Sequence, residues 1–129
     1  MALVLKLPIA PFAQVVLDED FARFLQREGN RHLVAGAAFG SRVAPHTREF
    51  EPALLSKCSP EFRRDLVAFD WWVHNADRTL GDYSGNPNLL WDTEQALPVV
   101  IDHNMAFDRG FEADKFQETH IFQADLAVL

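Results

Sequence analysis

The sequence has little of several features that mark specialised protein classes. It has one cysteine, Cys58, so it can form neither an internal disulfide nor a cysteine-based zinc or iron–sulfur site. No apolar run approaches the roughly 18 to 20 residues of a membrane-spanning helix. The first residues, Met1 to Lys6, have no charged region before their apolar run, unlike a secretory signal. We therefore expect a cytoplasmic protein with no membrane partner.

The sequence also has no internal repeat, no Gly/Ser linker and no excess of basic residues. The sequence has 12 Lys and Arg residues and 19 Asp and Glu residues, which gives a formal net charge of −7. Clustered positive charge is what attracts proteins to nucleic-acid phosphates, so no direct nucleic-acid partner is expected. Apolar residues make up 48% of the 129 residues and charged residues 24%, which is typical of a folded protein. We expect residues 1–129 to form a single domain.

The first half of the chain predicts a strand, a helix and a less regular segment. Residues 13–17 follow two prolines that oppose helix formation, and they have the pattern of a short half-buried strand. A helix should follow, because Asp18 can cap its start and Gly29 can end it. Residues 33–39 are apolar and small enough for either a buried strand or a tight loop. The next segment predicts a loop with a helical turn at residues 53–57.

The second half predicts a long helix followed by a β-hairpin. The helix begins at Ser59, a capping residue followed by a proline, and is expected to reach about Asn75. Apolar residues at spacings of four, three and four should form its buried stripe: Phe62, Leu66, Phe69 and Val73. Residues 89–91 and 97–101 are short apolar runs around a turn, which predicts a hairpin. Three tryptophans are expected to fill the core against it: Trp71, Trp72 and Trp91. The tail, residues 111–129, predicts one or two short helices.

Three polar residues have positions typical of a phosphoryl-transfer site. Asp77 lies in the loop after the long helix, Asn88 at the start of the first hairpin strand and Asp102 just after the second. In kinase-like sites an aspartate of the first kind orients or deprotonates the attacking hydroxyl, and the other two residues hold magnesium through hard oxygen atoms. The hairpin should bring Asn88 beside Asp102. Asn86 is the alternative to Asn88, and turn formation or strand termination is the structural alternative for these residues.

The segments around these residues resemble the catalytic core of the HipA-like kinase family. Three blocks in order carry the resemblance: residues 69–79, 86–91 and 100–107. A weaker resemblance covers residues 7–8 and 36–41 before these blocks and residues 120–122 after them. The resemblance implies a protein-kinase-related fold and phosphate transfer from ATP with magnesium; the best-known members are toxins that phosphorylate aminoacyl-tRNA synthetases. It further implies that Asp77 is the catalytic base and that Asn88 and Asp102 are the metal ligands.

The sequence departs from the family pattern at two places. Residues 80–85 look like an insertion between the first two blocks. Only 76 residues precede Asp77, whereas a complete N-lobe would need on the order of 60 to 80 residues beyond the helices already predicted. There is no glycine-rich phosphate loop. Lys6 is a poor candidate for the phosphate-pairing lysine, because the resemblance near Pro8 is already past the N-lobe of the family. The expectation is an α+β fold: a mostly helical C-lobe fragment, without an N-lobe, in which a β-hairpin carries the acidic site.

Two functions of different classes are compatible with this pattern. The first is a truncated kinase with an ATP and magnesium site, which would need a partner protein to supply an N-lobe surface. The alternative is a non-catalytic acidic interaction module or inhibitor that uses a pseudokinase scaffold to bind a partner protein. A solvated acidic surface is the structural alternative to a docking face. A homo-oligomer, formed through the surface that an absent lobe would leave, is a further expectation.

Overall fold

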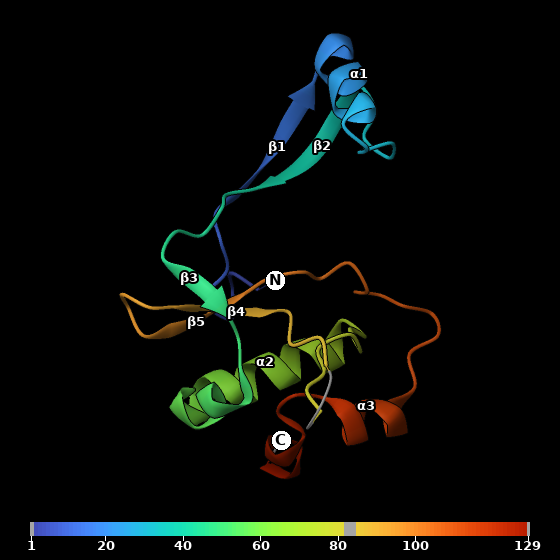
Figure 1. Ribbon diagram of the computed structural model, residues 1–129. Helices are drawn as coiled ribbons and strands as arrows, with labels where there is room; N and C mark the ends of the chain where they lie inside the picture. The colour runs from blue at the N-terminus through green and yellow to red at the C-terminus, as the bar shows by residue number, and fades with distance from the viewer. Residues whose placement is uncertain (1, 82–84, 129) are drawn as a thin grey trace. The chain divides into compact units, whose positions relative to one another are not determined.

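The computed structural model describes residues 2–81 and 85–128, which form an α+β fold with two small antiparallel sheets (Figure 1). Helices contain 32% of the residues and strands 21%. The prediction of an α+β fold is therefore confirmed, and the prediction that the fold is mostly helical is wrong. The chain has two compact units: a smaller unit, Ala10–Val43, and a main unit, Met1–Ile9 with Ala44–Leu129. That the whole chain acts as a single domain stays a prediction. No helix of the described part is long and apolar enough to cross a membrane.

The smaller unit consists of β1 (Phe12–Leu17), α1 (Glu19–Arg27) and β2 (Gly36–Ser41). The two strands pair antiparallel along their full lengths. The carboxylate of Asp18 accepts the backbone N–H of Phe21 at 2.8 Å and so caps α1. The predicted strand and capped helix are confirmed. The segment left open between a buried strand and a tight loop becomes a strand from Gly36 onward. Neither strand has the predicted burial, because most residues of β1 and β2 are exposed.

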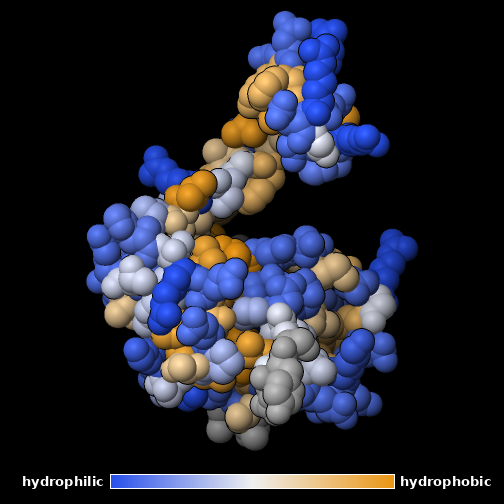
Figure 2. All heavy atoms as spheres, in the orientation of Figure 1, coloured by the Kyte–Doolittle hydropathy of each residue, from blue (hydrophilic) through white to orange (hydrophobic). Residues whose placement is uncertain are grey.

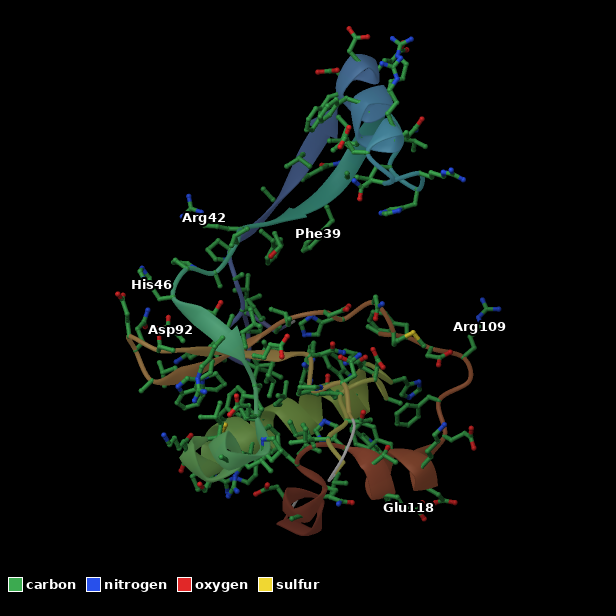
Figure 3. The ribbon with its side chains drawn as sticks, in the orientation of Figure 1. Phe39, Arg42, His46, Asp92, Arg109 and Glu118 are labelled. Carbon is green, nitrogen blue, oxygen red and sulfur yellow. The ribbon has the colours of Figure 1, made fainter. Side chains whose placement is uncertain are left out.

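Apolar side chains of the smaller unit remain largely exposed along its strands. Val16 is 81% exposed and Phe39 is 74% exposed. The rings of Phe12 and Phe39 lie 5.6 Å apart, and Figure 3 shows Phe39 extending from β2. In Figure 2 apolar residues follow the two strands, while hydrophilic ones gather over α1. One short helix has too little surface to cover both faces of a two-stranded sheet. The apolar side chains of the two strands therefore do not form a core within this unit.

The sheet of the main unit has three antiparallel strands in the order β3 (Thr47–Glu49), β4 (Leu89–Asp92) and β5 (Leu97–Val100). The last two form the predicted hairpin, in which Leu89 pairs with Val100. β3 occupies part of the segment that the sequence predicts as a loop. Its three residues are polar and have no apolar alternation, so only pairing with β4 orders them as a strand.

Four helical segments complete the main unit: η1 (Pro52–Lys57), α2 (Pro60–Trp72), α3 (Ala113–Thr119) and η2 (Gln123–Val128). The hydroxyl of Ser59 caps α2 by accepting a backbone N–H of its first turn at 3.2 Å. The long helix therefore starts as predicted and ends three residues earlier than predicted. The helical turn and the tail helices are confirmed as well.

The core of the main unit joins α2 to the three-stranded sheet, η1 and the tail. Its most buried apolar side chains include Leu54, Leu66, Val67, Phe69, Val73, Leu89, Trp91, Val100, Phe116 and Phe122. Trp91 is buried as predicted, but Trp71 and Trp72 are 37% and 54% exposed, so their predicted place in the core is wrong. At 100° per residue, positions 71 and 72 turn away from the buried side of α2, which contains Phe69 and Val73.

Candidate functional site

Asp77, the predicted catalytic base, contacts both Asn86 and Asn88, the two alternatives for the first metal ligand. Its Oδ2 accepts the side-chain N–H of Asn86 at 2.9 Å and that of Asn88 at 3.1 Å. The amide of Asn88 also lies 3.2 Å from the backbone oxygen of Asp77. Two amide donors on one carboxylate oxygen fix the orientation of the Asp77 side chain.

Asn88 lies directly before β4 and is almost fully buried, whereas Asn86 is exposed. Because the side-chain nitrogen of Asn88 donates to Asp77, its Oδ1 is the atom that can take a further ligand. The φ of Asn88 is +46°, in the left-handed region that asparagine tolerates better than most residues. Asn88 therefore combines a backbone turn with a fixed side-chain amide.

Asp102 lies just across the hairpin from Asn88. The backbone N–H of Ile101 donates to the backbone oxygen of Asn88 at 3.1 Å, so Asp102 directly follows this pair. Asp102 is exposed, its φ is +50°, and its Oδ1 accepts the N–H of Asn104 at 3.1 Å. The structure thus brings the two predicted metal ligands to the same end of β4 and β5. Their role as ligands stays a prediction.

The donor atoms at this end of the hairpin fit magnesium. Amide and carboxylate oxygens are hard ligands, and Asn88 and Asp102 each have one side-chain oxygen that is not used in a hydrogen bond described above. Magnesium commonly takes one or two protein carboxylates and completes its shell with water and substrate phosphates. In residues 2–81 and 85–128, no three His, Cys, Asp or Glu side chains gather as the ligands of one metal ion. The pair fits a metal that arrives with a nucleotide.

The predicted insertion, residues 80–85, includes residues 82–84, which lie outside the described residues. The two flanks of the insertion are joined directly. The backbone N–H of Thr79 donates to the backbone oxygen of Asn86 at 2.9 Å, and the N–H of Asn86 donates to Thr79 Oγ1 at 3.2 Å. With the loop closed at its base, Asp77 keeps its contacts with Asn86 and Asn88.

Four polar side chains next to this site form a buried group, which we call the Asp70 cluster: Asp70, Asn75, Arg78 and His120. Asp70 Oδ2 accepts Arg78 Nε–H at 2.7 Å and lies 3.1 Å from His120 Nε2, while Oδ1 accepts the amide of Asn75 at 2.9 Å. The backbone N–H of Phe122 donates to His120 Nδ1 at 3.1 Å. Nδ1 is therefore unprotonated, and the ring donates its Nε2–H to Asp70.

Burial and hydrogen bonding act in opposite directions on the charge of Asp70. Burial alone would raise the pKa of Asp70, but the hydrogen bond from His120 and the charge and hydrogen bond of Arg78 outweigh it and hold that pKa below its usual range. Burial lowers the pKa of His120, against the opposing effect of Asp70. The cluster thus holds an ionised Asp70, a charged Arg78 and a neutral His120 at neutral pH.

Arg78 also contacts the main chain around the predicted metal ligands. Its Nη1 donates to the backbone oxygen of Asn88, with the oxygens of Pro87 and Ile101 each at 3.3 Å. Its own charge is paired with that of Asp70, so the guanidinium joins the acidic side chain to the main chain of the hairpin.

Sequence reasoning missed the roles of Asp70, Asn75 and His120. One local signal was available, because Asp70 lies four residues after Leu66 on the buried side of α2. A carboxylate at a buried helical position requires a partner, and that requirement predicts a buried polar contact.

A cavity of about 710 Å³ opens beside Asp77. One side consists of residues from the loop that carries Asp77, including Thr79 and Leu80, and another of residues from α3, including Lys115 and Glu118. Figure 3 shows Glu118 on α3. The volume is in the range of pockets that hold small ligands or a protruding side chain.

Comparison with known proteins agrees with the resemblance seen in the sequence. A family model described as HipA-like kinase matches residues 1–128. Neither curated proteins nor solved structures gave a match. The matched region contains Asp77, Asn88, Asp102 and all members of the Asp70 cluster. The chain belongs to the HipA-like kinase family.

Proposed function

We propose that the chain carries a magnesium-dependent site that transfers phosphate from ATP to a Ser or Thr hydroxyl. Asp77 is the catalytic base, and Asn88 and Asp102 are the magnesium ligands. The observation that carries the proposal is the hydrogen-bonded grouping of Asp77 with Asn86 and Asn88 at the end of the hairpin where Asp102 lies. Membership of the HipA-like kinase family supports the same chemistry.

In the proposed reaction, the Asp77 carboxylate accepts the proton of the acceptor hydroxyl. The hydroxyl oxygen forms a bond to the γ-phosphorus, the bond between that phosphorus and the bridging oxygen breaks, and ADP leaves. The amides of Asn86 and Asn88 keep the carboxylate oriented, and the cavity beside Asp77 has room for the acceptor side chain. Magnesium, when bound, neutralises charge on the phosphates.

A pair of matched variants tests the metal ligand. In both Asp102 and Asp92, Oδ1 accepts the backbone N–H two residues later, and that of Asp92 accepts the N–H of Gln95 as well. Asp92 lies at the other end of the hairpin strands. Asp102→Ala and Asp92→Ala therefore remove a similar turn contact. ATP with magnesium should raise the Tm of the wild type and of Asp92→Ala, by an amount that grows with ligand concentration, and should not raise that of Asp102→Ala. An equal rise in both variants would exclude Asp102 as a ligand.

A second test concerns the base. Asp77→Asn keeps the shape of the side chain but cannot accept the hydroxyl proton. Transfer of radiolabelled phosphate should fall by about 10²- to 10⁴-fold, the usual range for loss of a general base. Candidate partner proteins should be included, because we also propose that a partner chain covers the nucleotide. Transfer at the wild-type rate by Asp77→Asn would contradict the assignment.

A second candidate function is a non-catalytic module that binds a partner protein. Two observations favour it: the exposed apolar side chains of β1 and β2, such as Val16 and Phe39, and the net charge of −7. On this proposal ATP with magnesium leaves the Tm unchanged, whereas a partner or a second copy of the chain raises it. Sedimentation of the purified protein distinguishes a monomer from a homo-oligomer.

A further inference from the structure

We propose that Arg78 and His120 are positioning residues for the phosphoryl-transfer site. Arg78 holds together the main-chain segments that carry Asn88 and Asp102, and His120 fixes Arg78 through the carboxylate that both share, that of Asp70. This inference rests on the proposed function, since it names the residues that keep the proposed ligands in place.

The first step of the argument is where the Arg78 guanidinium makes its contacts. Nη1 reaches the backbone oxygens of Asn88 and Pro87, before β4, and that of Ile101, after β5. One planar group thus joins two chain segments. The first contains Asn88 itself, and the second ends at Ile101, which directly precedes Asp102. Both Asn88 and Asp102 have a positive φ, so the main chain turns sharply at each of them. A donor between the segments holds these turns at a fixed separation.

The second step is what fixes the guanidinium itself. Arg78 Nε donates to Asp70 Oδ2 at 2.7 Å, and His120 Nε2 lies 3.1 Å from the same oxygen. All three side chains are fully buried or nearly so. The backbone N–H of Ile121 donates to the backbone oxygen of Arg78 at 3.0 Å, so the segment after α3 binds the backbone of Arg78 directly and its guanidinium through Asp70. His120 therefore acts on the site through Asp70 and touches none of the proposed ligands.

The third step is the relation to Asp77, which directly precedes Arg78. The Asp77 carboxylate is oriented by Asn88, and the backbone oxygen of Asn88 is held by Arg78. A change in the Arg78 side chain would move the base and the ligand together. Residues that orient ligands in this way typically alter metal affinity or activity by about 10- to 100-fold when they are changed.

Two substitutions of His120 separate positioning from a purely structural role. The amide nitrogen of Gln reaches the place of Nε2, so His120→Gln keeps the donor to Asp70. The amide oxygen of Asn reaches the place of Nδ1, so His120→Asn keeps the acceptor for the Phe122 N–H and loses the donor to Asp70. Leu54→Ala, in the core part formed by η1, is the control for general loss of stability.

The measurement is the affinity for ATP with magnesium, determined by calorimetry well below the Tm of each variant. His120→Asn should weaken binding by about 10- to 100-fold, while His120→Gln and Leu54→Ala should stay close to the wild type. Arg78→Lys keeps the charge and loses the fork of donors, so it should weaken binding at least as much as His120→Asn. If Arg78→Lys does not fold, the His120 pair alone decides. Equal affinity of His120→Asn and His120→Gln would overturn the inference.

A readout without nucleotide separates this inference from the proposed function. The side-chain amide of Asn88 gives its own NMR signals, whose shifts and exchange with water report its contact with Asp77. These signals should change in His120→Asn and stay in place in His120→Gln and Leu54→Ala. If the signals behave in this way although the protein binds no ATP, the positioning role of His120 is supported and the proposed function fails. If they stay in place in His120→Asn, positioning is overturned whatever the affinity for ATP.

Discussion

Two arginine–aspartate pairs of the same length lie in the two units of the chain. In the smaller unit Arg23 Nη2 is 2.7 Å from Asp20 Oδ1, and in the main unit Arg78 Nε is 2.7 Å from Asp70 Oδ2. The side chains of the first pair are 60% and 94% exposed, and those of the second are 0% exposed. Water screens the charges of the first pair, and it solvates the remaining charge when one residue of the pair is replaced. The second pair is buried, so water does not solvate the charge that remains when one residue is replaced. Distance alone therefore says little about what an ion pair contributes.

The largest expected effect is that of breaking the buried pair. Asp70→Asn leaves Arg78 as a buried charge without its counterion, so the free energy of unfolding should fall by about 3 to 5 kcal/mol. Asp20→Asn, which changes a pair of the same length, should leave it unchanged. Urea denaturation measures both variants. Equal losses would show that burial does not distinguish the two pairs.

The next largest effect concerns one residue type in the two units. Val67 is 0% exposed on α2, and Val16 is 81% exposed on β1. Val67→Ala should lower the free energy of unfolding by about 2 kcal/mol, because it removes buried methyl groups and leaves a cavity. Val16→Ala should change it by less than about 0.5 kcal/mol, the usual range for surface substitutions. A large loss in Val16→Ala would mean that another part of the protein or a second copy covers this strand.

A third prediction concerns His120, a buried histidine of the main unit, as the pH falls. Burial holds the pKa of His120 below its usual 6.5, so between 6.5 and that lower value the unfolded chain binds a proton that the folded chain does not. Stability should therefore decrease as the pH drops below 6.5, by at most about 1.4 kcal/mol per pH unit for one such group. His120→Gln should reduce this slope, leaving the share of His103, whose pKa is lowered by burial too.

The smallest effect is expected from the helix caps. Ser59 caps α2, which supplies much of the core of the main unit, so Ser59→Ala should lower the free energy of unfolding by about 1 kcal/mol. Asp18 caps α1, whose two phenylalanines, Phe21 and Phe24, are about half exposed. Asp18→Ala should speed hydrogen exchange in α1 without changing exchange in α2. Faster exchange in both helices would show that the two units unfold together.

The sequence predicted elements well where several local signals agree. Ser59, the proline after it and the apolar spacing together predicted α2, and two apolar runs around a turn predicted the hairpin. β3 shows the limit of such reasoning. Thr47–Glu49 is short and polar, and its strand conformation comes from pairing with β4, which lies some 40 residues further along the chain. Nothing within the segment itself indicates that pairing.

The burial of the tryptophans and the contacts of the site residues could be predicted from the sequence to different degrees. Trp72 and Trp91 have the same side chain, but only Trp91 lies where a second layer covers it. The grouping of Asp77 with Asn88 could be predicted because one hairpin and one loop create it. The contact between Asp70 and His120 could not, because it joins residues 50 positions apart through tertiary packing.

The contacts of Arg78 have a consequence for how this protein can diverge in sequence. Arg78 binds backbone oxygens at positions 87, 88 and 101, and every amino acid has such an oxygen. Substitutions at positions 87 and 101 that preserve the backbone path therefore leave these contacts intact. Under the proposed function, side chains near Asp77 can change, and acceptor preference with them, while the frame that holds Asn88 and Asp102 stays the same.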